Sequence, residues 1–161
     1  MLTTAYLSLG SNVGDRERNL RAAIAQLGEL GDVLAVSSFY ETEPVEFTDQ
    51  PWFLNCAVAL RTELTAQQFL AGIQHVEQEM GRRRIQPKGP RNIDLDILLF
   101  GDSIIATPEL EVPHPAMQQR RFVLEPLAEI APDARHPVLK HSVMELLQTL
   151  PSDGGKVRKI E

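Results

Sequence analysis

Residues 89–100 read Gly-Pro-Arg-Asn-Ile-Asp-Leu-Asp-Ile-Leu-Leu-Phe, and the remainder of the chain is arranged around them. A Gly-Pro turn signal and an arginine lead into a run of aliphatic residues that is typical of a buried strand. Two carboxylates, Asp94 and Asp96, lie within that run. Because side chains alternate between the two faces of a strand, both aspartates project from one face, while Leu95 and Ile97 point to the other.

A pair of carboxylates in an apolar strand indicates a metal site. The two charges repel each other and are costly to bury without compensation. A divalent cation removes that cost, and Mg²⁺ is commonly held by one or two carboxylates together with substrate phosphates. The alternative is that both aspartates lie on the solvated face of an edge strand. Nearby cationic residues favour the metal; these are Arg82, Arg83, Arg84, Lys88 and Arg91 upstream, and His114, Arg120 and Arg121 downstream.

Length and charge limit the class of protein. The chain has 161 residues, so we expect a single domain over residues 1–161. The formal net charge of -6 offers no global positive field for nucleic acid or an anionic membrane. The N-terminus is too short and too polar for a signal peptide, no apolar run is long enough to span a membrane, and the single cysteine, Cys56, fits a reducing compartment. We therefore expect a cytoplasmic protein that binds a small anionic ligand, and a monomer is the default expectation.

The hydrophobic pattern predicts an α+β fold. Strands are expected at 3–9, 33–40, 53–62 and from Asp94 onward, and the loops between elements include 43–51 and 82–91. Two helices are expected as well. The first has an apolar stripe at Leu20, Ala23, Ile24 and Leu27, and the second begins with a Thr65–Gln68 capping box, buries Phe69, Ile73, Val76 and Met80, and ends at Gly81. The resulting β-α-β-β-α-β order is the ferredoxin-like core, in which two helices cover one face of an antiparallel sheet.

The residues after Phe100 predict short additions to this core. Residues 103–105 are expected to form a short strand, and Pro113-His114-Pro115 an extended segment. Residues 126–130 and 142–150 are expected to be short helices. The polar tail from about residue 152 is expected to be mobile.

Common nucleotide-binding signatures are absent from the sequence. There is no G-x-x-x-x-G-K-[ST] loop and no G-x-G-x-x-G after a strand. Residues 10–14, Gly-Ser-Asn-Val-Gly, follow a strand but lack the lysine of a phosphate loop, so we interpret them as a tight turn and helix entry. A bound phosphate ester would therefore be held by arginines and a metal, and the planar guanidinium fork suits phosphate oxygens.

Five segments of the chain together resemble a known family. They are Leu7-Ser8-Leu9-Gly10-Ser11-Asn12, Ser38-Phe39-Tyr40-x-Thr42-x-Pro44, Gln50-Pro51-x-Phe53-Leu54-Asn55, Gly89-Pro90-Arg91-x-Ile93-Asp94-Leu95-Asp96-Ile97, and Val112-Pro113-His114 followed by Arg120 and Phe122. In this order, from about residue 4 to residue 131, the chain resembles the 6-hydroxymethyl-7,8-dihydropterin pyrophosphokinases of folate biosynthesis. The Gly-Pro-Arg-x-x-Asp-x-Asp segment with the downstream Pro-His is the most specific part of this resemblance.

The resemblance implies a reaction and a set of phosphate contacts. Enzymes of this family transfer the β,γ-diphosphate of ATP to the hydroxymethyl group of a reduced pterin and release AMP. Asp94 and Asp96 would hold two Mg²⁺ ions on the triphosphate, and Arg82 and Arg91 would stabilise charge on the transferring and leaving oxygens. The residues implied in ATP binding are Gln74, Glu77, Arg84, Arg91, Ile97, His114 and Arg120. For His114, the alternative is that its ring caps a backbone group between the two prolines.

The resemblance also implies a pterin site. Phe53 and Phe122 match the aromatic pair that sandwiches the ring, and Asn55 offers a donor and an acceptor in the plane of the pterin. The remaining implied pterin contacts are Thr42, Pro44, Val45 and Asp94. Glu109 and Glu111 lie where other members carry a basic or small polar residue, so no adenosine contact is carried over to them.

Two other classes of protein remain as alternatives. A ferredoxin-like sheet also serves as an RNA-binding module, which needs aromatic residues on its central strands and a basic face. A small-ligand regulatory module without catalysis is the second alternative, and it would need no paired aspartates within a cluster of arginines.

Overall fold

The computed structural model describes residues 2–43, 51–81, 92–151 and 157–160. Its strands are β1 (Thr3–Ser11), β2 (Asp32–Val36), β3 (Phe39–Thr42), β4 (Phe53–Thr62), β5 (Asp94–Phe100), β6 (Ile105–Ala106), β7 (Glu111–Val112) and β8 (Val157–Ile160). Its helices are α1 (Arg16–Leu27), α2 (Ala66–Glu79), α3 (Arg121–Ile130) and α4 (Val143–Gln148), with a 3₁₀ turn, η1 (Met117–Gln119), before α3.

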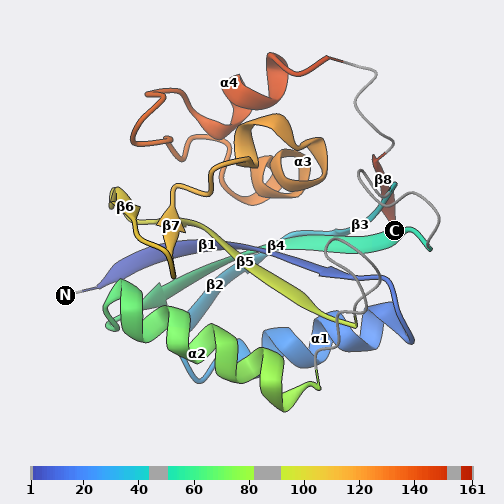
Figure 1. Cartoon of the computed structure of the whole chain (residues 1–161). Coiled ribbons are helices and arrows are strands. Elements are labelled where there is room, and N and C mark those ends of the chain that lie inside the picture. The colour runs from blue at the N-terminus through green and yellow to red at the C-terminus, as the bar shows by residue number, and fades with distance from the viewer. Residues whose placement is uncertain (1, 44–50, 82–91, 152–156, 161) are drawn as a thin grey trace.

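A six-stranded antiparallel sheet forms the centre of the fold. The strands run in the order β5-β1-β4-β3-β8, and β2 also pairs with β4. Helices α1 and α2 cover one face, while α3 and α4 lie over the other (Figure 1). The predicted ferredoxin-like α+β fold is confirmed, and the C-terminal helices give the sheet a second covered face.

The core beneath α1 and α2 follows the predicted pattern. The apolar stripe of α1 is buried at Leu20, Ala23 and Leu27, and Asp15 caps its first turn. The capping box between Thr65 and Gln68 is present at the start of α2, whose buried residues are Ala66, Phe69, Ile73 and Val76. Gly81, with a φ of 67°, follows the end of α2 in the left-handed conformation that glycine tolerates. Cys56 is 1% exposed, and burial raises the pKa of its thiol to about 12, as expected of an unreactive core residue.

A second core lies beneath α3 and α4. Its buried residues include Leu98 and Leu99 of the sheet and Leu124 and Leu127 of α3. The short helix expected at 126–130 is longer in the structure, because α3 begins at Arg121 and contains Pro126. Burial of the Pro126 ring offsets the backbone hydrogen bond that proline cannot donate. The helix predicted at 142–150 is confirmed as α4, with a capping box between Ser142 and Glu145.

The predicted strand 33–40 is divided into β2 and β3. The Ser37 N–H donates to the Ala57 carbonyl at 2.9 Å, and the Ser37 hydroxyl accepts from the Ala57 N–H at 2.9 Å. The Ser37 side chain thus takes the place of a main-chain carbonyl in the hydrogen-bond ladder with β4. The register against β4 shifts by one residue between Val36, which is opposite Val58, and Tyr40, which is opposite Asn55. Because of this shift, Tyr40 and Asn55 lie side by side on the same face of the sheet.

Two further predictions at the C-terminal end need correction. The short strand expected at 103–105 is β6, displaced to Ile105–Ala106, where it pairs with β7. The prediction of a mobile tail is wrong for residues 157–160, which form β8 beside β3. Polar residues suit this position, since β8 is an edge strand with its side chains largely in solvent. In the described part of the chain, the helices are too short or too polar to cross a membrane.

Candidate active site

The predicted metal ligands on β5 and the predicted pterin contacts on β4 lie on the sheet face toward α3 and α4, whereas Ile97 of β5, implied in ATP binding, lies on the other face. Leu95 and Ile97 belong to the core beneath α1 and α2, so Asp94 and Asp96 project from the opposite face. The same alternation on β4 places two further predicted residues on this face, Phe53 and Asn55. The sheet therefore brings the predicted metal ligands and the predicted pterin contacts to one surface.

Strand register sets the spacing of these groups. Gly10 of β1 pairs with Asn55 on one side and with Asp94 on the other. Ser8 pairs in the same way with Ala57 and Asp96. Because neighbouring strands lie about 4.8 Å apart, roughly 10 Å separates the backbones of the Asn55 and Asp94 strands.

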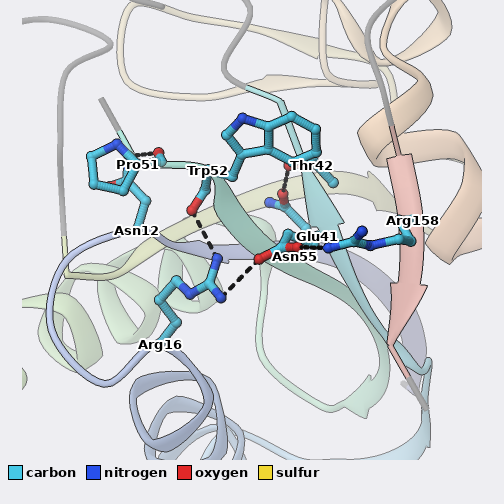
Figure 2. Close-up of polar contacts among 8 residues, drawn as sticks. All are labelled: Asn12, Arg16, Glu41, Thr42, Pro51, Trp52, Asn55 and Arg158. Carbon is cyan, nitrogen blue, oxygen red and sulfur yellow. Dashed lines mark hydrogen bonds and ion pairs between the residues drawn. The ribbon is translucent and has the colours of Figure 1, made fainter. Parts of the chain in front are cut away.

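Asn55 is held in place by two hydrogen bonds within the protein. Its Oδ1 accepts a hydrogen bond from the Thr42 hydroxyl (Figure 2). Its Nδ2 donates to the Leu9 carbonyl at 3.2 Å. Asn55 is 5% exposed and Thr42 2% exposed. An amide can make four hydrogen bonds, so these two orient the group and leave capacity for an in-plane ligand.

The absence of a side chain at Gly10 makes room for Asn55. A Cβ atom at this position would lie 2.7 Å from Asn55 Nδ2 and 3.5 Å from Phe53 Cδ1. The prediction interpreted residues 10–14 as a tight turn, but Gly10 and Ser11 continue β1 and lie inside the sheet. Gly10 is therefore a strand residue that permits close approach, which sequence reasoning missed.

Glu77 contacts the strand that carries the two aspartates. Its Oε2 accepts a hydrogen bond from the Leu95 N–H at 3.0 Å, between Asp94 and Asp96 in the sequence. Strand β5 is at the edge of the sheet, so this N–H faces away from β1, toward α2. Glu77 therefore supports the backbone of the proposed metal site. Asp94 and Asp96 are half-buried, and their oxygens are the hard donors that Mg²⁺ prefers, so this pair fits the predicted ion.

A cavity of about 220 Å³ lies beside Asp96. It is lined by Leu70, Ile73, Leu95, Asp96, Ile97, Glu109, Leu110, Glu111, His114 and Pro115. Two residues implied in ATP binding, Ile97 and His114, thus share a cavity with a proposed metal ligand. Glu109 and Glu111, to which no contact was carried over, also line it.

The ring of His114 fulfils the capping role that was the alternative for this residue. The ring Nδ1 accepts a hydrogen bond from the Ala116 N–H at 3.2 Å. The backbone N–H of His114 donates to the Leu98 carbonyl at 2.9 Å. Because Nδ1 acts as an acceptor, the neutral ring carries its proton on Nε2. Capping and ligand binding are therefore compatible, since they use different nitrogens.

Phe122 and Arg120 lie at the start of α3. The Arg120 guanidinium carbon is 5.6 Å from the centroid of the Phe122 ring, within the range of a cation–π contact. Phe122 is half-buried and packs against the second core. Its helix covers the face that carries Phe53, so both members of the predicted aromatic pair belong to the same side of the sheet (Figure 1).

Several predicted residues are not placed in this arrangement. Gln74 is on the exposed surface of α2, one turn before Glu77. The remaining predicted site residues lie outside the described part of the chain: Pro44, Val45, Arg82, Arg84 and Arg91.

A second polar cluster on this face was not predicted. The Tyr40 hydroxyl donates to Glu129 Oε1 at 2.6 Å, and the Ser38 N–H and hydroxyl donate to Glu129 Oε2 at 2.9 and 3.0 Å. Burial, followed by the hydrogen bond to Glu129, raises the pKa of Tyr40. These contacts join α3 to β3 beside Thr42. The pairing depends on residues far apart in the chain, so no local pattern signals it.

Fold and site together define an α+β protein whose ferredoxin-like sheet presents paired aspartates beside an oriented amide. Oxygen donors next to a cavity of this kind are suited to phosphoryl transfer from a metal-bound nucleotide. Comparisons with known proteins identify the family. Residues 6–132 match the family model described as 7,8-dihydro-6-hydroxymethylpterin-pyrophosphokinase (HPPK).

Relatives with this name cover most of the chain. The chain is 52% identical over 132 residues to the 2-amino-4-hydroxy-6-hydroxymethyldihydropteridine pyrophosphokinase of Bacillus subtilis, a match that covers 81% of this chain and 79% of that protein. It is 42% identical over 156 residues to the protein of the same name from Pseudomonas aeruginosa, covering 96% of each. The chain belongs to the HPPK family. Its predicted class, a pyrophosphokinase, is therefore confirmed.

Longer proteins contain a similar domain. The folic acid synthesis protein fol1 of Schizosaccharomyces pombe is 43% identical over 152 residues, which is 93% of this chain but 21% of that protein. A Plasmodium falciparum HPPK-DHPS crystal structure superposes with a TM-score of 0.74 at 17% identity, covering 92% of this chain and 43% of that one. The chain thus spans only part of these relatives, and the structural match supports the fold.

Proposed function

We propose that this chain transfers the β,γ-diphosphate of ATP to the hydroxymethyl group of 6-hydroxymethyl-7,8-dihydropterin and releases AMP, as a step in folate biosynthesis. Family membership supports the reaction class. The structural observation that carries the proposal is the row formed by Asn55, Gly10 and Asp94, which presents an oriented amide and a carboxylate on one face. This row can hold a flat heterocycle with its hydroxymethyl group directed toward the aspartates.

The proposed metal ligands are Asp94 and Asp96. Both project from one face of β5, and Glu77 supports the peptide between them. Bound there, two Mg²⁺ ions would neutralise phosphate charge and lower the pKa of the attacking hydroxyl. The aspartates would orient the triphosphate so that its β-phosphorus faces the pterin hydroxymethyl group. Arg82 and Arg91 are proposed to stabilise the transferring and leaving oxygens.

The pterin would bind against Asn55, with Phe53 on one side of the ring and Phe122 on the other. Both protein hydrogen bonds of Asn55 are formed before a ligand arrives, so little orientational freedom is lost on binding. The remaining proposed contacts are Thr42, Pro44, Val45 and Asp94.

ATP would occupy the cavity beside Asp96. His114 would donate from Nε2 to a phosphate oxygen, and Ile97 would provide apolar contact. The carboxylates of Glu109 and Glu111 repel phosphate but accept hydrogen bonds from amino and hydroxyl groups, so the nucleoside is expected on their side. Gln74, Glu77, Arg84, Arg91 and Arg120 complete the proposed ATP-binding set, with Glu77 acting through the Leu95 N–H.

We further propose that the chain works as a cytoplasmic monomer and binds no nucleic acid. Its acidic net charge of -6 supports small-molecule substrates over a nucleic acid.

The decisive experiment is incubation with ATP, Mg²⁺ and the reduced hydroxymethylpterin, followed by chromatography of the nucleotides. A pyrophosphokinase releases AMP, whereas transfer of a single phosphate would release ADP. A binding module without catalysis would release neither, and that result would refute the proposal. Calorimetry of ATP binding with and without Mg²⁺ is the companion measurement, and the pyrophosphokinase should show strong dependence on the metal.

A further inference from the structure

A polar cluster joins the two described ends of the segment that connects β3 and β4. Asn12 Nδ2 donates to the Pro51 carbonyl at 3.0 Å, and Arg16 donates from one guanidinium nitrogen to the Trp52 carbonyl, also at 3.0 Å. The other terminal nitrogen of Arg16 forms an ion pair with Glu41 Oε2 at 3.0 Å (Figure 2). Arg16 therefore bridges the last residues of β3 and the residue just before β4.

The cluster lies directly behind the proposed pterin contacts. Glu41 and Thr42 are consecutive in β3 and point to opposite faces, so the Arg16 ion pair and the Thr42–Asn55 hydrogen bond flank the same peptide. On the other strand, Trp52 immediately precedes Phe53. Both ends of the Arg16 bridge are thus one residue from a proposed pterin contact.

Glu41 has a second cationic partner that lacks the link to β4. Arg158 of β8 also donates to Glu41, through Oε1 (Figure 2). The hydrogen bond from Arg16 contributes most to lowering the pKa of the Glu41 carboxyl, and that from Arg158 lowers it further, so the carboxyl is ionised at neutral pH. The Arg158 side chain is 72% exposed and that of Arg16 30% exposed. The more buried arginine is the one that spans the two strands.

We propose that Arg16 is a positioning residue for the pterin site: its forked contact with Glu41 and the Trp52 carbonyl sets the positions of Thr42 and Phe53. This inference rests on the proposed function. The inference goes beyond that function because Arg16 lies on α1, on the opposite face of the sheet from the proposed pterin contacts. A guanidinium suits this task because two of its nitrogens can hold two acceptors in a fixed relative orientation.

The first test measures steady-state kinetics of Arg16→Ala against the matched control Arg158→Ala. Both variants remove one arginine from Glu41, but only the first also releases the Trp52 carbonyl. We expect Arg16→Ala to raise the KM for the pterin at least about tenfold, the factor typical of losing a hydrogen bond to a charged group, with kcat and the KM for ATP within about threefold. Arg158→Ala is expected to leave the KM for the pterin unchanged. Arg16→Lys, whose single ammonium lacks the fork, should restore only part of the loss.

A second test needs no substrate, because Trp52 is the single tryptophan of the chain. Its fluorescence reports on the residue whose carbonyl accepts the hydrogen bond from Arg16. Acrylamide quenching of Trp52 is expected to increase in Arg16→Ala and to stay at the wild-type level in Arg158→Ala.

These outcomes separate the inference from the proposed function. If the wild type releases AMP but Arg16→Ala keeps its KM for the pterin and its Trp52 quenching, Arg16 has no positioning role. Equal effects of Arg16→Ala and Arg158→Ala, or parallel rises in both KM values, would also overturn the inference. If the wild type releases no AMP, the proposed function fails, and the quenching comparison still decides whether Arg16 holds Trp52 in position.

Discussion

Asn55 and Asp94 lie on either side of Gly10 in one row of the sheet, although they are far apart in the sequence. Asn55 approaches the backbone of β1 so closely that a Cβ on Gly10 would stand 2.7 Å from its Nδ2. The row therefore contains three features: an amide with a fixed orientation, a carboxylate two strands away, and a glycine between them.

The first prediction concerns Gly10→Ala. The added methyl group should displace the Asn55 amide and break its bonds to Thr42 and Leu9. We expect the KM for the pterin to rise at least about tenfold and the free energy of unfolding to fall by roughly 1–2 kcal/mol, as for the loss of a buried hydrogen bond. Steady-state kinetics and urea denaturation measure the two effects. In an Asn55→Ala background the same substitution should add little, and full additivity would contradict this mechanism.

The second prediction concerns Asp96→Ala. Loss of a proposed metal ligand should slow AMP release at least about a thousandfold, because metal stabilisation of the transition state is worth several kcal/mol. The fold should persist, since Asp96 is only half-buried and lies on an edge strand. Circular dichroism provides the control for folding. Near-normal turnover in this variant, or in wild type treated with EDTA, would rule out the metal assignment.

The third prediction concerns the pH dependence of stability through Glu129. Burial alone would raise the pKa of this carboxyl, but hydrogen bonds from Tyr40 and Ser38 outweigh it and lower the pKa below its ordinary value of 4.5. A carboxyl with a lowered pKa in the folded state stabilises the fold above its unfolded-state pKa, and this stabilisation disappears as the pH falls through the folded-state pKa. Glu129→Gln should therefore lower the free energy of unfolding at pH 7, and the difference from wild type should disappear at the acidic end of the titration. A difference that stays constant from pH 7 to pH 3 would show that the charge is unimportant. Urea denaturation across this range, with Glu125→Gln on the same helix as the control, measures it.

The fourth prediction concerns the C-terminal strand. Ending the chain after Pro151 removes β8, its pairing with Phe39–Thr42 of β3 and the Arg158–Glu41 ion pair. Because β8 is a largely exposed edge strand, we expect a loss of roughly 1–3 kcal/mol in the free energy of unfolding rather than global unfolding. Thermal denaturation tests this. An unchanged Tm would indicate that β8 contributes nothing in solution.

Local patterns predicted much of the fold for identifiable reasons. The apolar stripe of α1 and the capping box of α2 depend on residues within one or two turns of each other, so the sequence displays them directly. The division between β2 and β3 could not be predicted in this way, because it depends on hydrogen bonds between Ser37 and Ala57 of another strand. The same holds for β8, whose polar sequence becomes a strand only by pairing with β3.

In the candidate site too, local features could be predicted from the sequence, whereas contacts between distant residues could not. The spacing of Asp94 and Asp96, and of Phe53 and Asn55, was enough to place each pair on one face of its own strand, since alternation along a strand is local. The sequence alone thus determined the family, the ferredoxin-like element order and the types of side chain on each strand face, namely carboxylates on β5 and an amide and an aromatic ring on β4. Only the tertiary structure decided that Gly10 lies between Asn55 and Asp94. The same is true of the hydrogen bond that Glu77 accepts from β5 and of the contact that Arg16 makes with both Glu41 and Trp52. These relationships depend on strand register and helix packing, which arise from contacts between residues distant in the chain and leave no periodic signal in it.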